Sequence, residues 1–170
     1  ELTQPYNQVP VVKAAIRAKA TNVGQVPFKI AKLGSDKPLE SGPMWMLFHD
    51  VNPYMTSTQL YEAIVTNMDL GGDCPIVLDP NRVAGDIPAA LWPRRWDQVH
   101  EAYRNGYFAG WKVDKGTGEP DIVLPEDMLM PKYYNPYDIL RGDAPAKVLT
   151  LALRAEWGAI KFNQMFFEND

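Results

Sequence analysis

The residue types that most often perform chemistry in proteins are few and scattered in this sequence. The two histidines, His49 and His100, belong to no H-E-x-x-H pair and to no cluster with the spacing of zinc ligands. The single cysteine, Cys74, opens a short apolar run, and a catalytic thiol needs a base positioned beside it. We therefore expect both histidines to be structural and Cys74 to be a small buried hydrophobe.

Carboxylates and glycines also lack a catalytic pattern. The acidic pair at residues 126–127 follows a proline and is interpreted as part of a turn, because a glycosidase pair is defined by distance in space. The glycines at 71–72 follow a helical pattern, whereas a dinucleotide-binding loop follows a strand and opens a helix. No P-loop and no G-x-S-x-G elbow occurs. The sequence predicts a protein that is not an enzyme and holds no cofactor or metal.

Aromatic and arginine side chains are the remaining feature, and they gather between residues 92 and 111. Such a mixture is typical of a β-rich core edged by arginine, of a subunit interface, or of a site for single-stranded nucleic acid. Periodicity does not separate the first two. The residues that we name as a possible subunit interface are Trp92, Arg94, Arg95, Trp96, Arg104 and Trp111.

Length and composition indicate one ordinary globular domain. The chain has 170 residues, of which 46% are hydrophobic and 22% charged, so a core can form without a disulfide or metal. The net charge of -4 argues against a protein that grips nucleic acid through a general basic surface. It is compatible with a passage through which DNA slides without tight phosphate contacts.

The absence of targeting signals indicates an intracellular protein that does not enter a membrane. The chain has a single cysteine, no N-glycosylation sequon, no signal peptide, and no apolar run near the ~20 residues of a membrane span. It starts with Glu1 rather than Met and stops just after a helical pattern. We interpret both ends as cut, and the chain as a fragment of a longer protein.

Helical spacing predicts four helices. The best marked begins after Thr56, which forms a capping box with Gln59, and it ends at the glycines of residues 71–72. Met55 and Leu60 add a hydrophobic staple. The other helices are expected over residues 10–23, 44–49 and 145–167.

Alternating and apolar runs predict short strands between these helices. A half-buried strand is expected over residues 27–33, and others over 74–78, 89–92, 107–113, 122–124 and 128–130. The order of helices, then strands, then a long helix is typical of an α+β domain. We expect one domain over residues 1–170, with helices flanking a small mixed or antiparallel sheet and a long C-terminal helix.

Several segments carry family-like motifs in a fixed order. Residues 47–56 join a leucine-led helix end to an Asn-Pro turn, and residues 70–74 end the next helix with Gly-Gly-Asp-Cys. Residues 124–130 contain Pro-Glu-Asp followed by a predicted strand. Residues 137–145 lead into the last predicted helix, and residues 166–169 end it. Together with residues 11–16, 26–30 and 91–93, they resemble the phage portal protein family of tailed double-stranded DNA phages.

The sequence departs from the family pattern at a few positions, none of which is catalytic. Val51 stands where proline is common, Asp73 where asparagine is usual, Cys74 where alanine is usual, and Met130 where histidine is common. Residues 143–144 are Asp-Ala in place of Leu-Ser.

The resemblance implies a structural role. Portal subunits form a dodecameric ring at one capsid vertex, in contact with the major capsid protein, the terminase and head–tail adaptor proteins. Double-stranded DNA passes through the ring without sequence-specific recognition. The chain would supply the wing region, without the stem, clip and crown, and would be found in the virion and, during assembly, in the host cytoplasm.

In such a ring the residues between 92 and 111 would contact the neighbouring subunit. Two alternatives stay open at this point. One is another phage or bacterial protein-interaction module of α+β fold. The other is an unrecognised hydrolase, which a cleft joining carboxylates to His49 or His100 would favour.

Overall fold

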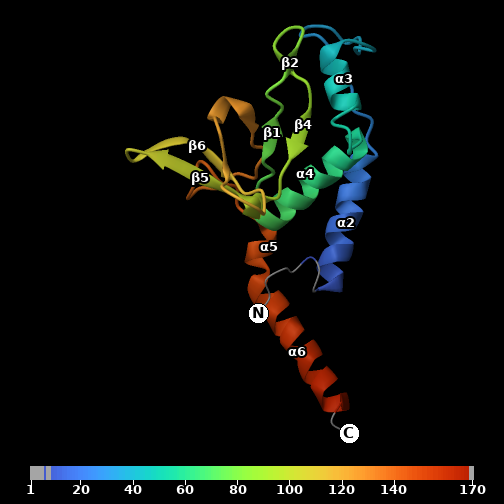
Figure 1. Cartoon of the computed structure of the whole chain (residues 1–170). Coiled ribbons are helices and arrows are strands. Elements are labelled where there is room, and N and C mark those ends of the chain that lie inside the picture. Colours follow the sequence, from blue (N-terminus) through green and yellow to red (C-terminus); the bar gives the residue numbers. More distant parts are fainter. Residues whose placement is uncertain (1–5, 7–8, 169–170) are drawn as a thin grey trace.

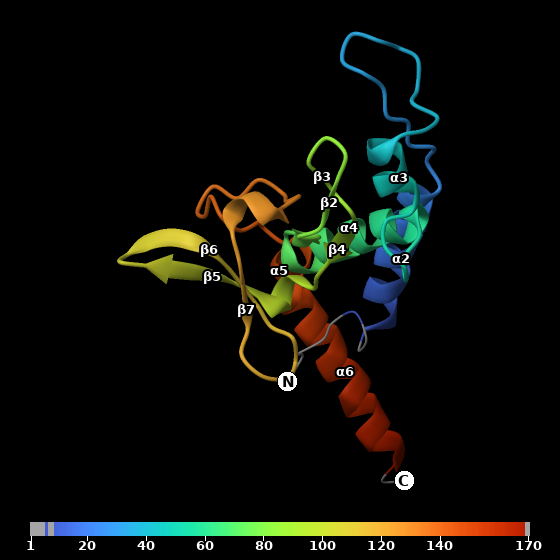
Figure 2. The same ribbon diagram turned by 45° about the horizontal axis from the view of Figure 1, so that its top comes forward.

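The computed structural model describes residue 6 and residues 9–168. It is an α+β structure in which helices accompany small antiparallel sheets, so the predicted class is confirmed. Figure 1 shows the helices α2 and α3 on one side, a central sheet with α4 in the middle, and the strands β5 and β6 on the other side. Figure 2 shows the same order after a rotation.

Three helices open the fold: α2 (Pro10–Gly24), α3 (Pro43–His49) and α4 (Ser57–Gly71). The side chains of Ile16 and Ala20 on α2 are buried, and α2 packs along α4. A Cβ added at Gly24 would lie 3.1 Å from the side chains of Thr58 and Glu62 of α4. Glycine therefore allows the end of α2 to approach α4 closely.

The start of α4 agrees with the capping box that was predicted from the sequence. Thr56 is the N-cap, its hydroxyl accepts from the backbone N–H of Gln59, and the Gln59 side chain accepts from the backbone N–H of Thr56. This reciprocal pair satisfies two N–H groups that an open helix end leaves without partners. At the other end Gly72 adopts a left-handed conformation, with φ of 92°, which stops the helix.

The central sheet has three short antiparallel strands in the order β4-β1-β8, namely β4 (Leu91–Pro93), β1 (Ile76–Leu78) and β8 (Met128–Leu129). Its side chains alternate between two cores. Ile76 lies in a cluster with Leu47, Leu60 and other residues beneath α3 and α4, whereas Val77 packs against a second cluster.

That second cluster contains Val99, Trp111, Val113 and Met128. It lies under the other three-stranded sheet, which is antiparallel in the order β5-β6-β7: β5 (Val99–Arg104), β6 (Tyr107–Val113) and β7 (Asp121–Val123). Asn105 and Gly106, both with positive φ, form the two-residue turn between β5 and β6.

The remaining elements are short. A small hairpin joins β2 (Arg82–Val83) to β3 (Ile87–Pro88), and two 3-10 helices, η1 (Trp96–Gln98) and η2 (Pro125–Asp127), precede β5 and β8. At the C-terminal end, α5 (Pro145–Val148) and α6 (Thr150–Glu168) lead away from the end of α4 (Figure 1).

The prediction of a half-buried strand over residues 27–33 was wrong. Within this segment only Ala31 pairs, through an isolated bridge to Pro38, and Leu33 is fully exposed. Among the described residues no strand lies beside the segment, so its alternating pattern has no sheet to join. Phe28 instead contacts the rings of Phe48 and Tyr61 at centroid distances of 5.5 Å and remains 57% exposed.

Candidate functional site

The aromatic and arginine residues between 92 and 111 divide into buried and exposed members. Trp111 is only 5% exposed and packs edge-on against Phe108 at 5.0 Å, so its indole belongs to the second core and not to the surface of the chain. Trp92 and Trp96 are half-buried. Arg94, Arg95 and Arg104 are exposed.

The two half-buried tryptophans are held by polar contacts. The indole N–H of Trp92 donates to the Asp79 carboxylate at 3.0 Å, and this hydrogen bond is the main reason why the pKa of Asp79 lies below its ordinary value. The backbone N–H of Trp96 donates to the side-chain oxygen of Asn67 on α4. The indole of Trp96 lies directly over Gly71, where an added Cβ would come within 2.0 Å of the ring.

Two of the exposed arginines lie before β5 in the sequence, and the third lies at its end. Arg95 forms an ion pair with Asp97, two residues away. Arg104 ends β5 at the turn, between Tyr103 and Tyr107, whose exposed fractions are 61% and 80%. This tip therefore presents two tyrosines and an arginine to solvent, residue types that are enriched in protein interfaces.

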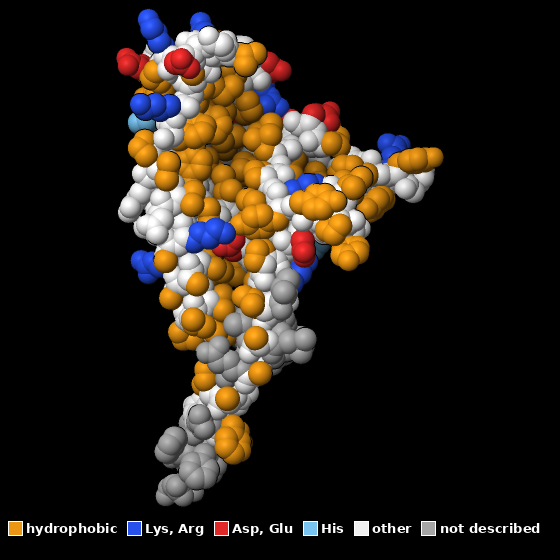
Figure 3. Space-filling view, turned by 180° about the vertical axis from the view of Figure 1, so that it is seen from behind, with side chains coloured by type: hydrophobic (Ala, Val, Ile, Leu, Met, Phe, Trp, Pro, Cys, Tyr) orange, Lys and Arg blue, Asp and Glu red, His pale blue; other side chains and the backbone are white. Residues whose placement is uncertain are grey.

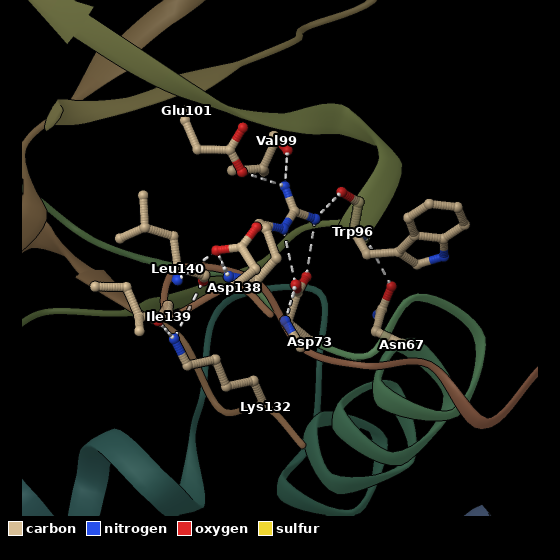
Figure 4. A network of polar contacts seen from close by, with 11 residues as sticks. Asn67, Asp73, Trp96, Val99, Glu101, Lys132, Asp138, Ile139 and Leu140 are labelled. Atoms are coloured by element: carbon tan, nitrogen blue, oxygen red, sulfur yellow. Dashed lines mark hydrogen bonds and ion pairs between the residues drawn. The ribbon is translucent and has the colours of Figure 1, made fainter. Parts of the chain in front are cut away.

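A buried ion pair that was not predicted from the sequence lies at the start of β5 (Figure 4). The Asp73 side chain is fully buried just after α4, and the Arg141 guanidinium contacts both of its oxygens, with Nε at 2.8 Å and Nη2 at 3.1 Å. The same guanidinium donates to the backbone oxygens of Val99 and Trp96 at 2.6 and 3.0 Å, and contacts Glu101 at 3.4 Å. One side chain thus joins α4, η1 and β5 to the loop before α5.

The backbones meet at the same place. Gly142 donates its N–H to Asp73 Oδ2 at 3.0 Å. A Cβ added at Gly142 would lie 1.9 Å from the carbonyl oxygen of Gly72, and one added at Gly72 would lie 2.4 Å from the carbonyl group of Gly142. Two glycines are therefore needed for the end of α4 to touch the loop that leads into α5. We call the group formed by Gly72, Asp73, Arg141 and Gly142 the anchor.

A second polar group ties α2 to the same region. The Lys19 ammonium donates to Asp69 at 2.7 Å and to the Tyr133 hydroxyl at 2.9 Å, and this hydroxyl donates to Asp69 at 2.8 Å. Asp69 is 7% exposed. The hydrogen bond to Asp69 is the largest cause of the raised pKa of Lys19.

The loop that carries Tyr133 also exposes apolar side chains. Tyr134, Tyr137 and Ile139 are 87%, 95% and 88% exposed. The loop backbone is nevertheless constrained, because the Lys132 ammonium donates to the carbonyls of Ile139 and Leu140, and the Asp138 side chain accepts from two backbone N–H groups. Apolar side chains on a constrained loop lose little entropy when they bind a partner, so they suit protein contacts.

The groups that sequence analysis considered for catalysis lie apart. His49 stacks on Trp45 and pairs with Asp50 on the surface, and His100 is exposed on β5. Burial and the neighbouring Asp73 raise the pKa of the Cys74 thiol to about 12. Within the described part of the chain, no group of three or more His, Cys, Asp or Glu side chains could hold a metal ion.

A groove of about 390 Å³ lies where the end of α2 meets α3 and the start of α4. His49 lines it together with aromatic and apolar side chains such as Phe28, Trp45 and Tyr61, and no carboxylate is among its lining residues. None of the described helices is both long and apolar enough to cross a lipid bilayer.

The family model described as phage portal protein matches residues 10–170. A comparison of the sequence with curated proteins gave no match.

Three similar solved structures come from gene transfer agent (GTA) particles. One chain is in the virion of the native particle (TM-score 0.78, 19% identity), one in the neck of the empty particle computed with C6 symmetry (0.79, 20%), and one in the neck of the native particle computed with C12 symmetry (0.78, 18%). They cover 97–98% of this chain, which spans only 43–45% of their length. At these identities the likeness establishes a shared fold.

Proposed function

This chain belongs to the phage portal protein family, and we propose that it is part of a structural subunit of the portal ring at one vertex of a viral capsid. The ring forms the passage for packaging and ejection of DNA and the connection between head and tail. The observation that carries this proposal is the match of one family model to residues 10–170. The shared fold with chains from particle necks, one of them computed with twelvefold symmetry, supports it.

The assembly that we propose is a homo-oligomeric ring of twelve subunits. Its partners are the major capsid protein, the terminase, head–tail adaptor proteins and double-stranded DNA that passes through the channel. The subunit resides in the virion and, during assembly, in the host cytoplasm. Its role is structural rather than enzymatic.

Within the subunit, residues 1–170 form one domain, which corresponds to the wing. In this arrangement α5 and α6 together act as the long helix that leaves the domain, and the anchor fixes where that helix starts. The short chain is consistent with this assignment, since it spans less than half of the similar chains. The stem, clip and crown would lie in the rest of a longer protein.

The subunit interface that we propose uses the exposed part of the region named from the sequence. It consists of Arg94, Arg95 and Arg104 with the half-buried Trp92 and Trp96. Trp111 supports this surface from the core. A ring needs two different faces on each subunit, one for either neighbour, and this surface would form part of one of them.

The ring is tested by mass photometry and negative-stain microscopy of the complete protein. We expect closed rings of twelve subunits with a central hole. A stable monomer or dimer at all salt and protein concentrations would overturn the portal assignment.

The interface is tested by Arg95→Glu and Trp96→Ala, which should impair ring assembly. Because the Trp96 indole covers Gly71, its removal also affects folding, so Arg104→Glu at the exposed tip serves as a second surface variant. Lys37→Glu, an exposed residue outside this region, is the matched control. Normal rings with all three variants would remove this region from the interface.

A further inference from the structure

Charge is distributed unevenly along the chain. Residues 9–33, which cover α2 and the segment after it, contain five basic residues and no acidic one. The whole chain has 17 basic and 21 acidic residues, so the acidic excess lies entirely in the remaining segments. We call residues 9–33 the basic side.

The basic side is available for contact. Ile16 and Ala20 face α4, which leaves Lys13 and Arg17 exposed on the outer part of α2, and Lys29 and Lys32 are exposed in the following segment. None of these four forms an ion pair with another described residue, whereas Lys19 is held by Asp69. Exposed apolar side chains lie among them: Val11, Val26 and Phe28 are 55%, 62% and 57% exposed.

Residues 114–127 have the opposite character. This segment runs from the end of β6 through β7 to η2 and contains five acidic residues and one basic residue. Lys115 pairs with Asp121, and Arg82 pairs with Asp127, but Glu119 and Glu126 are exposed and have no described ion pair. Ile122 and Leu124 between them are 58% and 49% exposed. We call this segment the acidic side.

The two sides lie on opposite flanks of the chain. In both Figure 1 and Figure 2, α2 lies to one side of the central sheet and α4, and β5 and β6 lie to the other; Figure 2 shows β7 on that side as well. Figure 3, seen from behind, shows Lys and Arg side chains along the edge that carries the helices, with Asp and Glu side chains among them at its upper end, and hydrophobic side chains over the middle of the face. A single chain therefore cannot bring its own basic and acidic sides together.

We propose that the basic side of one subunit contacts the acidic side of the next subunit in the ring. The inference rests on the proposed portal function. A head-to-tail interface joins two different patches of identical chains and closes into a ring when the rotation permits. Opposite charges on the two patches favour this pairing and disfavour contact of like patches, which gives the ring its direction. The apolar side chains on each side, with charges around them, match the usual composition of interfaces.

Two charge-reversed variants of the complete protein test this pairing. Lys13→Glu with Arg17→Glu lowers the net charge of residues 9–33 from +5 to +1, and Glu119→Lys with Glu126→Lys brings residues 114–127 from -4 to 0. Each variant alone removes most of the electrostatic attraction between the two sides, so the subunit concentration needed for half-maximal ring assembly should rise roughly tenfold or more.

Controls with the same charge change elsewhere identify position as the cause. Lys147→Glu with Lys161→Glu matches the first variant, and Asp50→Lys with Asp86→Lys matches the second; all four residues are exposed. We expect these controls to assemble as the wild type does. Mass photometry of each protein over a range of concentrations measures ring mass.

The outcomes separate this inference from the portal function. If the wild-type protein forms no ring, the proposed function fails. If the wild type forms rings and each reversed variant alone also does so at the same concentration, the pairing of sides is wrong. If Lys13→Glu with Arg17→Glu assembles normally but loses binding of a double-stranded DNA fragment, the basic side contacts a polyanion instead, which also overturns the inference.

Discussion

The anchor and the two charged sides of this chain use the same residue types for opposite purposes. At the anchor the Asp73 carboxylate is fully buried and the Arg141 guanidinium contacts four acceptor groups from distant segments. On the basic and acidic sides, by contrast, lysines, arginines and glutamates are exposed and most of them form no ion pair with another described residue. Charge that is buried and paired fixes the fold, whereas charge that is exposed and unpaired is available for a neighbour.

The largest effect is expected when the anchor loses one partner. Arg141→Met leaves the Asp73 carboxylate buried without its counter-ion, and the free energy of unfolding should fall by about 3–5 kcal/mol. Urea unfolding followed by circular dichroism measures this loss. The matched control is Arg95→Met, which breaks the exposed pair with Asp97 and should cost about 1 kcal/mol or less. Equal losses of unfolding free energy in the two variants would show that the buried pair stabilises the fold no more than the exposed pair does.

The backbone contact at the anchor should be nearly as sensitive. In Gly72→Ala the new Cβ would lie 2.4 Å from the carbonyl group of Gly142 at a φ of 92°, and both the clash and the backbone strain are unfavourable. We expect a loss of roughly 2–5 kcal/mol in the free energy of unfolding. Gly106→Ala, at a φ of 81° with open space around it, separates the two causes, since only the strain of about 1–2 kcal/mol applies. A Gly72→Ala variant no less stable than Gly106→Ala would show that the backbones do not touch.

A smaller effect is expected where α2 is tied to α4. Lys19→Met removes a partly exposed ion pair with Asp69 and should reduce the free energy of unfolding by about 1 kcal/mol at pH 7. Because the folded protein raises the pKa of Lys19 above its ordinary value of 10.5, this contribution is complete below pH 10.5 and is lost as the pH rises through the folded value. The difference between wild type and variant, measured by urea unfolding at pH 7, 9 and 11, should shrink only at the highest pH. A difference that stays constant up to pH 11 would contradict the role of the Lys19 charge.

Local signals in the sequence were sufficient for the first three helices and insufficient for several strands. The capping box at Thr56 and the glycines after α4 placed that helix within a residue or two. The strand β5 was missed because Val99–Arg104 mixes apolar and charged residues, yet Asn105-Gly106 is a strong hairpin signal that could have revealed it. The segment 27–33 shows the reverse error, since alternation alone cannot supply a neighbouring strand.

The anchor was beyond local reasoning, because Asp73 and Arg141 are separated by 68 positions. Neither residue belongs to a recognisable active-site pattern, and an isolated aspartate or arginine on the sequence is usually a surface residue. Both nevertheless lie in segments that carried the family resemblance, residues 70–74 and 137–145. The structure brings those two segments into contact, which gives a physical reason for their motifs. Trp111, named from the sequence as part of the interface, lies in the core, a distinction that periodicity had left open.

The long separation within the anchor also has a consequence for synthesis. A ribosome that adds roughly 5–20 residues per second needs several seconds to make the 68 positions between Asp73 and Arg141. During that interval α4 has already been synthesised, but the Asp73 carboxylate at its end has no counter-ion and must stay hydrated. The end of α4 can be desolvated only after the last strand and the loop before α5 have emerged. Docking of that loop is therefore a late event, and a subunit still on the ribosome lacks the fixed geometry that closure of the proposed ring would demand.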